Sequence, residues 1–285
     1  MISLQEIIPW RANAPWSNDL MVEQDFLLCR SVQAIFGDAK LKKQLAMRGG
    51  TVLHKAHLAP ASRYSEDIDL VLVANRSPKG IKEDIARVLE PVLGKPSESV
   101  VTTVTLAVRN LFSKSEIARI TYVCGPTSAL AAHAHLKIEV NLNEQENLYP
   151  LTHVDMDVPG PGRTVEKCPV VSYDIDEMLG TKLRALLQRE HGRDLYDLWR
   201  AWAASQAPGA TVVVDPRRVG TAFRFYMAQE KTSFSAKDAQ AELQRRMQSR
   251  KFLEDMNGFL PPGVQYDPHG AYRVFLEVFL PHLDA

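Results

Sequence analysis

Two aspartates one residue apart, Asp67 and Asp69, are the residues whose type and spacing most directly indicate chemistry. They begin a β-branched apolar run, residues 68–73, which predicts a strand. Side chains alternate between the faces of a strand, so both carboxylates share one face while Ile68 and Leu70 point to the core. Two carboxylates this close repel each other unless a cation lies between them. Mg²⁺, with Mn²⁺ as an alternative, is the natural cation because it takes oxygen ligands and leaves positions for substrate phosphates.

A second predicted strand, residues 136–142, offers a third carboxylate. Its apolar residues share one face, and Glu139 shares the other face with Lys137 and Asn141. A third carboxylate would complete a two-metal site, which activates an attacking hydroxyl and stabilises departing pyrophosphate. The alternative, that Glu139 is an ordinary solvent-facing residue on an edge strand, stays open.

Small residues upstream of the aspartates predict a phosphate site. Gly49, Gly50 and Thr51 precede a short predicted helix over residues 51–58. Glycines let the backbone approach a phosphate, and the N-terminus of a helix favours negative charge. Ser65 offers a hydroxyl to the same phosphates. These residues therefore predict a site for the phosphates of a substrate.

A lysine follows in the second half of the chain, where helical periodicity runs from about residue 172 almost to the end. Lys182 lies beside or within the apolar stripe of its predicted helix. A lysine there loses hydration unless an anion meets it. That anion is a nucleotide phosphate or Asp194 of the next helix; a lysine snorkelling from the edge of the stripe is the third interpretation. Asp194 and Asp197 are also candidate structural partners of Lys182 or Arg193.

These segments resemble a known family. The motifs are RGGTVL at residues 48–53, RYSEDIDL at 63–70, LGTKLRALLQR at 179–189 and GRDLYDLW at 192–199. In this order they are similar to the motifs of the AbiEii/AbiGii (MenT-type) nucleotidyltransferase toxins, members of the DNA polymerase β-like nucleotidyltransferase superfamily. The last 85 or so residues carry no motif that can be placed.

The resemblance implies an α+β fold, in which a mixed β-sheet nucleotidyltransferase core with flanking helices precedes a mostly helical C-terminal domain. It implies a Mg²⁺-dependent toxin that transfers NMP from an NTP to the 3′ acceptor end of tRNA, releases pyrophosphate and blocks translation. It also implies a cognate antitoxin. Two alternatives stay open: the same chemistry on a protein or small-molecule hydroxyl, and a non-catalytic nucleotide- or RNA-binding protein.

Three groups of site residues are predicted. The resemblance implicates Asp69, Lys182 and Asp194 in activity. The predicted catalytic residues are Asp67, Asp69, Lys182 and Asp194; the nucleotide-binding residues are Gly49, Gly50, Thr51, Ser65 and Lys182; the metal ligands are Asp67, Asp69 and Glu139.

Composition narrows the class of protein. With 34 basic and 34 acidic residues the net charge is zero, which excludes a uniformly cationic nucleic-acid coat protein. Isolated Cys29, Cys124 and Cys168 predict reduced thiols. No targeting signal or long apolar stretch is visible, so a soluble cytoplasmic protein is expected, with no membrane partner. Two domains are predicted, residues 1–165 and 166–285, divided after a Pro/Gly loop at 158–162.

Other polar groups have less specific patterns. Asp155 and Asp157 are predicted in a solvated loop, whereas Asp174 is predicted to cap a helix in a capping box with Glu177. Two histidine pairs, His54/His57 and His133/His135, are more typical of ordinary surface or core histidines than of a transition-metal site. Four basic residues at 245–251 fit either an RNA-binding face or a solvated helix flank equally well.

Overall fold

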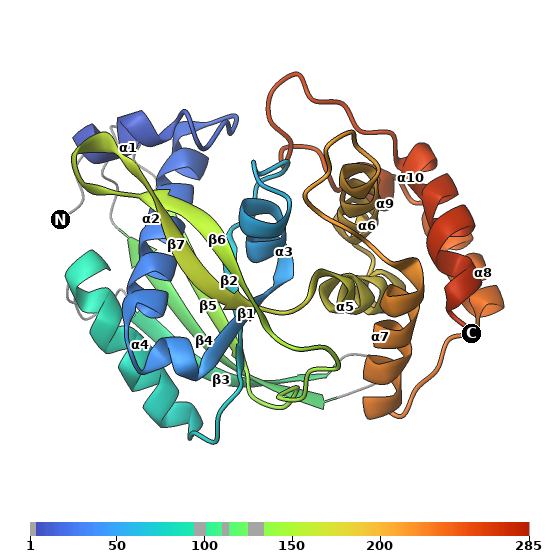
Figure 1. The fold of residues 1–285 in the computed structure, drawn as a ribbon, viewed down its shortest axis with the longest axis horizontal. Coiled ribbons are helices and arrows are strands. Elements are labelled where there is room, and N and C mark those ends of the chain that lie inside the picture. The colour runs from blue at the N-terminus through green and yellow to red at the C-terminus, as the bar shows by residue number, and fades with distance from the viewer. Residues whose placement is uncertain (1–3, 94–100, 110–113, 125–133, 285) are drawn as a thin grey trace.

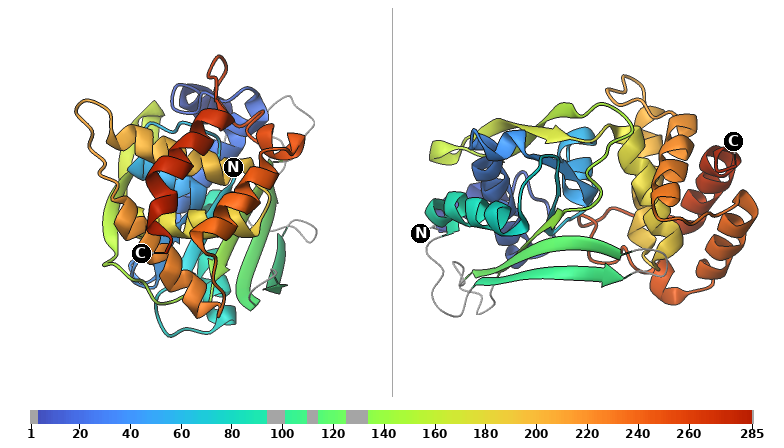
Figure 2. Two further views of the ribbon diagram at one scale, coloured as in Figure 1. Left: turned by 90° about the vertical axis from the view of Figure 1, so that its right-hand side faces the viewer. Right: turned by 90° about the horizontal axis from the view of Figure 1, so that it is seen from below.

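The computed structural model describes residues 4–93, 101–109, 114–124 and 134–284 (Figure 1). A mixed β-sheet forms from the first part of the chain and helices form the rest, which confirms the predicted α+β fold. The helical part lies against one end of the sheet part (Figure 2). The strands are β1 (Leu45–Arg48), β2 (Asp67–Leu72), β3 (Val101–Arg109), β4 (Lys114–Cys124), β5 (Ala134–Asn141), β6 (Thr152–Pro159) and β7 (Val165–Ser172).

The strand that carries the two aspartates is central in the sheet. Within the described residues the strand order is β3-β4-β5-β2-β1-β7-β6. β2 is antiparallel to β1 and parallel to β5, so its backbone is hydrogen-bonded on both sides. Ile68 and Leu70 are buried, as the alternation predicts. A strand held on both sides is a rigid support for Asp67 and Asp69 on its other face.

Helix α2 (Asp19–Gly37) lies in the concave side of the sheet, which curves around it (Figures 1 and 2). It contacts β2, β5, β6 and β7 as well as α4 (Pro78–Leu93). The Asn18 side chain caps it by accepting a hydrogen bond from the backbone N–H of Met21 at 2.9 Å. Most of its apolar residues recur at helical spacing and are buried, as expected for a helix that packs on a sheet.

A buried charged cluster joins α1 (Leu4–Trp10) and α2 to the helical segment after β1. The Asp25 carboxylate accepts hydrogen bonds from the indole N–H groups of Trp10 at 2.7 Å and Trp16 at 2.8 Å. Lys55 lies 2.6 Å from the same carboxylate. The charge of Asp25 is thus fully paired inside the core, as a buried charge must be. Lys55 belongs to a π-helical turn, Leu53–His57, that continues α3 (Gly49–Val52).

The helical part is built on one central helix. Its helices are α5 (Ile175–Gln188), α6 (Gly192–Ser205), α7 (Pro216–Gln229), α8 (Ala236–Arg246), α9 (Arg250–Leu253) and α10 (Pro268–Val274). Helix α5 packs against α6, α7 and α8. Asp174 caps α5 as predicted, accepting from the N–H of Asp176 at 2.9 Å. The predicted capping box is wrong, because Glu177 is buried and accepts instead from the N–H groups of Leu148 and Tyr149.

Two further sequence predictions differ from the structure. Asp155 and Asp157 do not lie in a loop: they alternate along β6, with Met156 and Val158 buried between and beside them. The sheet also continues beyond the predicted domain boundary at 165/166, since β7 ends at Ser172 and α5 begins at Ile175. The division into two domains stays a prediction.

The predicted reduced cysteines and the histidine pairs lie only partly within the described residues. Cys29 and Cys168 are free and buried, and burial raises the pKa of the Cys168 thiol to about 11. The side chain of Cys124 and all of His133 lie outside the described residues. Among the described helices none is long and apolar enough to cross a membrane.

Candidate active site

The predicted carboxylates meet at one cavity. β2 and β5 are parallel neighbours, and their register places Asp67 opposite Lys137 and Asp69 opposite Glu139. A cavity of about 440 Å³ opens on this face of the sheet and extends to α5 and α6. The predicted site residues that line it are Gly50, Ser65, Asp67, Asp69, Glu139 and Lys182.

Glycines let the helical segment after β1 approach the aspartates. Gly49 has a φ of 84°, a left-handed conformation that favours glycine. A Cβ there would collide with the carboxylate of Asp69. A Cβ on Gly50 would lie 3.0 Å from the Ser65 hydroxyl. Gly49 is therefore required for the close approach of this turn to β2, and Gly50 leaves room for the side chains of Arg63 and Ser65.

Thr51 does not line the cavity but holds the residues that do. Its side chain is buried, and its hydroxyl donates to the backbone carbonyl of Asp67 at 2.6 Å and lies 2.9 Å from the Ser65 hydroxyl. The structure thus places Thr51 behind Ser65, where it fixes the start of β2.

The carboxylates are crowded, and two cations partly balance them. Lys137 Nζ lies 2.7 Å from Asp67 Oδ2, and Arg119 Nε donates to Glu139 Oε1 at 2.7 Å. Burial and the charge of Asp69 raise the pKa of Asp67 to about 6, against the effect of Lys137. Burial and the charge of Glu139 likewise raise the pKa of Asp69. Among the described residues, no side chain donates a hydrogen bond to the Asp69 carboxylate.

A hard divalent cation fits the aspartate pair. Asp67 and Asp69 supply oxygen donors on one face of a rigid strand, and their mutual repulsion favours a cation between them. Glu139 fits less directly, because Arg119 already donates to it. Lys137 lies 2.7 Å from Asp67 and 3.8 Å from Glu139, so it would have to move for a cation to bind either carboxylate. Consistent with this, no three His, Cys, Asp or Glu side chains in the described part of the chain form a ready metal-binding group.

Lys182 and the aspartates of α6 form a buried network behind the cavity. Lys182 Nζ lies 2.9 Å from Asp197 Oδ2 and 3.4 Å from Asp194 Oδ1. The side chain of Lys182 is nearly buried, which excludes the snorkelling interpretation. Asp194 also accepts two hydrogen bonds from Arg189, at 2.8 and 2.9 Å. Asp194 is completely buried and does not line the cavity, so the structure places it beside Lys182 rather than beside a substrate.

Asp197 is the centre of this network. Arg63 donates to its two oxygens at 2.7 and 2.8 Å, and His54 Nε2 lies 2.8 Å away. Burial alone would raise the pKa of Asp197, but the charges of Arg63 and Lys182 hold it well below its usual range. Burial and the charge of Arg63 lower the pKa of His54 to about 4, so His54 is neutral at pH 7. His54 is therefore a satisfied core histidine, as its pattern predicts.

Nine further described residues line the cavity without having been assigned to the site from the sequence: Arg63, Glu66, Ile117, Arg119, Lys137, Arg189, His191, Arg193 and Phe259. Arg63, Arg189 and Arg193 line it, and they flank the predicted residues inside the motifs that carry the family resemblance. Phe259 also lines it, from the loop between α9 and α10. Sequence offered no signal for Phe259, because this loop lies in the part of the chain without a motif.

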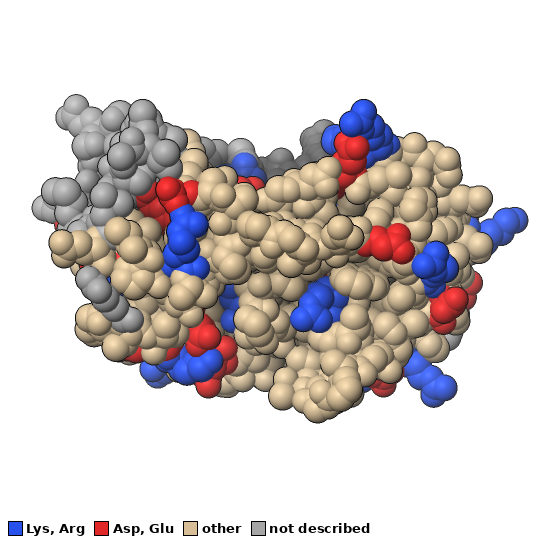
Figure 3. Space-filling model, turned by 90° about the horizontal axis from the view of Figure 1, so that it is seen from above, with Lys and Arg blue, Asp and Glu red and all other residues tan. Residues whose placement is uncertain are grey.

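The basic residues at 245–251 do not all point to solvent. Arg246 is buried, and its guanidinium donates to backbone carbonyls at the end of α5, including that of Leu187 at 2.8 Å. Arg245 and Arg250 pair with acidic neighbours on their own helical segments. On the face drawn in Figure 3, basic side chains are scattered and mostly lie beside acidic ones.

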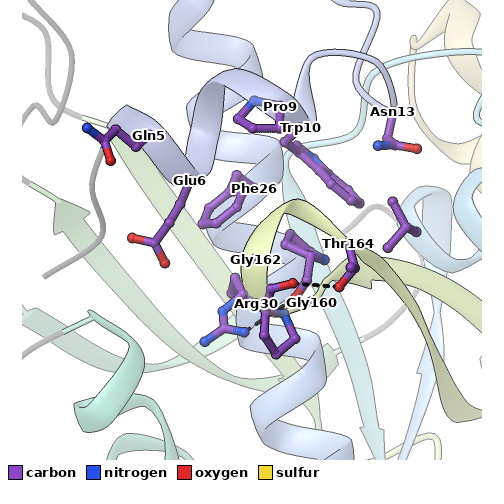
Figure 4. Close-up of a pocket in the computed structure, with 13 residues that line it drawn as sticks. Gln5, Glu6, Pro9, Trp10, Asn13, Phe26, Arg30, Gly160, Gly162 and Thr164 are labelled. Atoms are coloured by element: carbon purple, nitrogen blue, oxygen red, sulfur yellow. Dashed lines mark hydrogen bonds between the residues drawn. The ribbon is translucent and has the colours of Figure 1, made fainter.

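A second cavity, of about 390 Å³, lies away from these residues, between α1, α2 and the β6–β7 turn (Figure 4). Arg30 donates to the carbonyl of Pro159 at 3.3 Å, and Thr164 donates to that of Pro161 at 2.7 Å. Of the residues that line it, Glu6 is the one acidic side chain, so this cavity lacks a carboxylate pair. The cavity at β2 and β5 is therefore the candidate active site.

Comparisons with known proteins concern the family and the fold of the chain. A family model described as "Nucleotidyl transferase AbiEii toxin, Type IV TA system" matches residues 30–278, which include all the residues named above that line the candidate active site. No curated protein sequence matches the chain. The fold is similar to that of MenT4, a nucleotidyltransferase toxin from Mycobacterium tuberculosis H37Rv, with a TM-score of 0.52 and 15% identity over 98% of this chain and 86% of that one. At this identity the likeness concerns the fold.

Proposed function

Because the chain belongs to the AbiEii nucleotidyltransferase toxins of type IV toxin–antitoxin systems, we propose that its acceptor is the 3′ end of tRNA. The family implies a nucleotide substrate and an antitoxin partner. In the proposed reaction the tRNA hydroxyl oxygen bonds to the α-phosphorus of an NTP. The bond between the α-phosphorus and the bridging oxygen breaks, and pyrophosphate leaves.

The distribution of charge in the cavity most directly supports the nucleotide substrate of the proposed reaction. Carboxylates from β2 and β5 face cations from α5 and α6 across one cavity of about 440 Å³. A nucleoside triphosphate with its divalent cation carries charges that match both sides. Six Lys or Arg side chains line the cavity against four Asp or Glu, and Asp194 and Asp197 behind the cavity pair with three of these cations. The charges of the site therefore balance without a substrate, and the RNA acceptor is proposed from the family resemblance rather than from an excess of positive charge.

Each group of residues in the cavity has its own role in the proposed reaction. Asp67 and Asp69 would hold Mg²⁺, and Glu139 would become a third ligand once its cationic partners move. The metal would stabilise charge on the phosphates and activate the acceptor hydroxyl. Gly50 and Ser65 line the part of the cavity next to these aspartates, with Gly49 and Thr51 supporting them, and would receive the phosphates. Lys182 balances their charge. The hydroxyl proton would pass to a carboxylate of the cavity or to solvent water.

Label transfer tests the proposal. The purified protein is incubated with Mg²⁺, total tRNA and each α-labelled nucleoside triphosphate in turn, alongside Asp69→Asn, which keeps the shape of the carboxylate without its charge. We expect label in tRNA with at least one nucleotide, and none with the variant. Magnesium-dependent nucleotide binding without label in tRNA would indicate another acceptor, such as a protein hydroxyl.

Blocked translation is the proposed consequence, since a tRNA extended at its 3′ end cannot be aminoacylated. The modified tRNA is recovered and charged with its amino acid by the matching synthetase. We expect charging to fall in proportion to the fraction labelled. Full charging of labelled tRNA would contradict this consequence while leaving the transfer itself intact.

A further inference from the structure

The loop between α9 and α10 returns to the sheet part and places an aromatic ring at the candidate active site (Figure 1). The backbone N–H of Tyr64 donates to the carbonyl of Phe259 at 2.7 Å. The rings of Tyr64 and Phe259 are stacked, with centroids 6.4 Å apart and an interplanar angle of 28°. Phe259 is thereby fixed to the residue that directly precedes Ser65.

An arginine plane covers this ring. The Arg193 guanidinium lies over Phe259, with Cζ 4.8 Å from the ring centroid. Asp255 fixes Arg193 by accepting from its backbone N–H at 2.9 Å and from Nε at 3.3 Å. Arg193 and Phe259 both line the cavity that contains the carboxylates. The pair, here called the Arg193–Phe259 platform, is thus held by two separate parts of the chain.

Phosphate chemistry does not require such a platform. Triphosphate and metal are met by charged and hydroxyl groups, whereas aromatic rings and guanidinium planes bind nucleobases by stacking. The platform lies in the same cavity as the proposed phosphate-binding groups, since Ser65, Lys182, Arg193 and Phe259 all line it. A base joined to phosphates held at Ser65 and Lys182 would therefore have the platform within the same cavity.

We propose that the Arg193–Phe259 platform is the subsite for the base of the donor nucleoside triphosphate. This inference rests on the proposed function of the cavity. Since every base has a stacking face, the platform would contribute to the binding of all four nucleotides and leave discrimination among them to other groups.

The test compares nucleotides with a ligand that has phosphates and no base. Dissociation constants are measured by calorimetry, with Mg²⁺, for ATP, CTP, GTP, UTP and inorganic tripolyphosphate. For Phe259→Leu we expect about tenfold weaker binding of every nucleotide that the wild type binds, because the Arg193 plane that would receive the base loses the ring that supports it. Tripolyphosphate should bind as it does to the wild type, and Phe259→Trp should bind nucleotides like the wild type.

A second variant covers a possible failure of Phe259→Leu to fold, because Phe259 also packs on Tyr64. Arg193→Lys keeps the charge and removes the plane, so it should weaken nucleotide binding and leave tripolyphosphate binding unchanged. Equal losses for nucleotide and tripolyphosphate, or no loss, would overturn the platform while leaving the transferase intact. Weaker binding of tRNA with unchanged NTP binding would assign it to the acceptor base instead. If the wild type binds neither nucleotide nor tripolyphosphate, the proposed function itself fails.

Discussion

Replacing Asp197 by asparagine should destabilise the protein strongly. Asp197 is completely buried and pairs with Arg63 at 2.7 Å and Lys182 at 2.9 Å. Asparagine keeps the shape of the side chain but leaves these two cations out of water without this counter-charge. Removing one partner from a buried ion pair costs about 3–5 kcal/mol. We expect the lower end, about 3 kcal/mol, because Lys182 retains Asp194 at 3.4 Å.

Urea unfolding followed by tryptophan fluorescence measures this loss as a lower midpoint at unchanged slope. Asp157→Asn is the matched control: its carboxylate pairs with Lys167 at 2.6 Å on an exposed surface, and such pairs contribute at most about 1 kcal/mol. Losses that agree within about 0.5 kcal/mol in the two variants would refute the reasoning. A double-mutant cycle with Lys182→Met should add a coupling of about 1 kcal/mol or more, since the methionine removes one of the uncompensated charges.

Three further predictions concern other parts of the molecule. Gly49→Ala should lower the free energy of unfolding by about 1–2 kcal/mol because its backbone is left-handed. The new Cβ should also displace Asp69, so magnesium-dependent nucleotide binding should be lost. Gly209→Ala is the control: its φ is 72° but nothing lies within 4 Å, so it should have the same backbone strain and bind nucleotide normally. Arg246→Met should lower the free energy of unfolding by about 2 kcal/mol, because backbone carbonyls at the end of α5 lose their donor, and a change under about 0.5 kcal/mol in urea unfolding would contradict this role. Burial opposes ionisation of Glu144, but the charges of Arg48 and Arg184 lower its pKa from 4.5 to about 2. The contribution of the ionised carboxylate to the free energy of unfolding is therefore complete above pH 4.5 and is lost as the pH falls towards 2. Glu144→Gln should flatten the dependence of the unfolding free energy on pH between these two values.

Local patterns predicted the elements that carry the carboxylates. Alternation over residues 67–72 is a property of a few neighbouring residues, and it placed both aspartates on the face opposite Ile68 and Leu70. The same signal was present around Asp155 and Asp157, where Val154, Met156 and Val158 alternate with them. The adjacent Pro/Gly cluster is typical of a loop, and the loop predicted for Asp155 and Asp157 was wrong.

Contacts between distant segments could not be predicted in this way. The apolar stripe of α5 left three interpretations for Lys182, because its partner is chosen by how α6 packs on α5. Arg246 lies in a run of basic residues that indicates solvent exposure, yet it satisfies carbonyls of a helix some 60 residues away in sequence. Phe259 reaches the site through a loop that no local pattern places beside Tyr64. Each depends on tertiary packing rather than on periodicity.

The buried network also explains how Asp194 can matter for activity without touching a substrate. An ammonium group has three donors. Asp197 at 2.9 Å and Asp194 at 3.4 Å account for two donors of Lys182, which leaves one for a group inside the cavity that Lys182 lines. A phosphate could therefore bind Lys182 without breaking the network, and the two aspartates would fix the direction of the remaining donor. Asp194 also holds Arg189, a second cation of the cavity. From this geometry we infer that Asp194 would position Lys182 and Arg189, so that its loss should weaken phosphate binding through both cations at once.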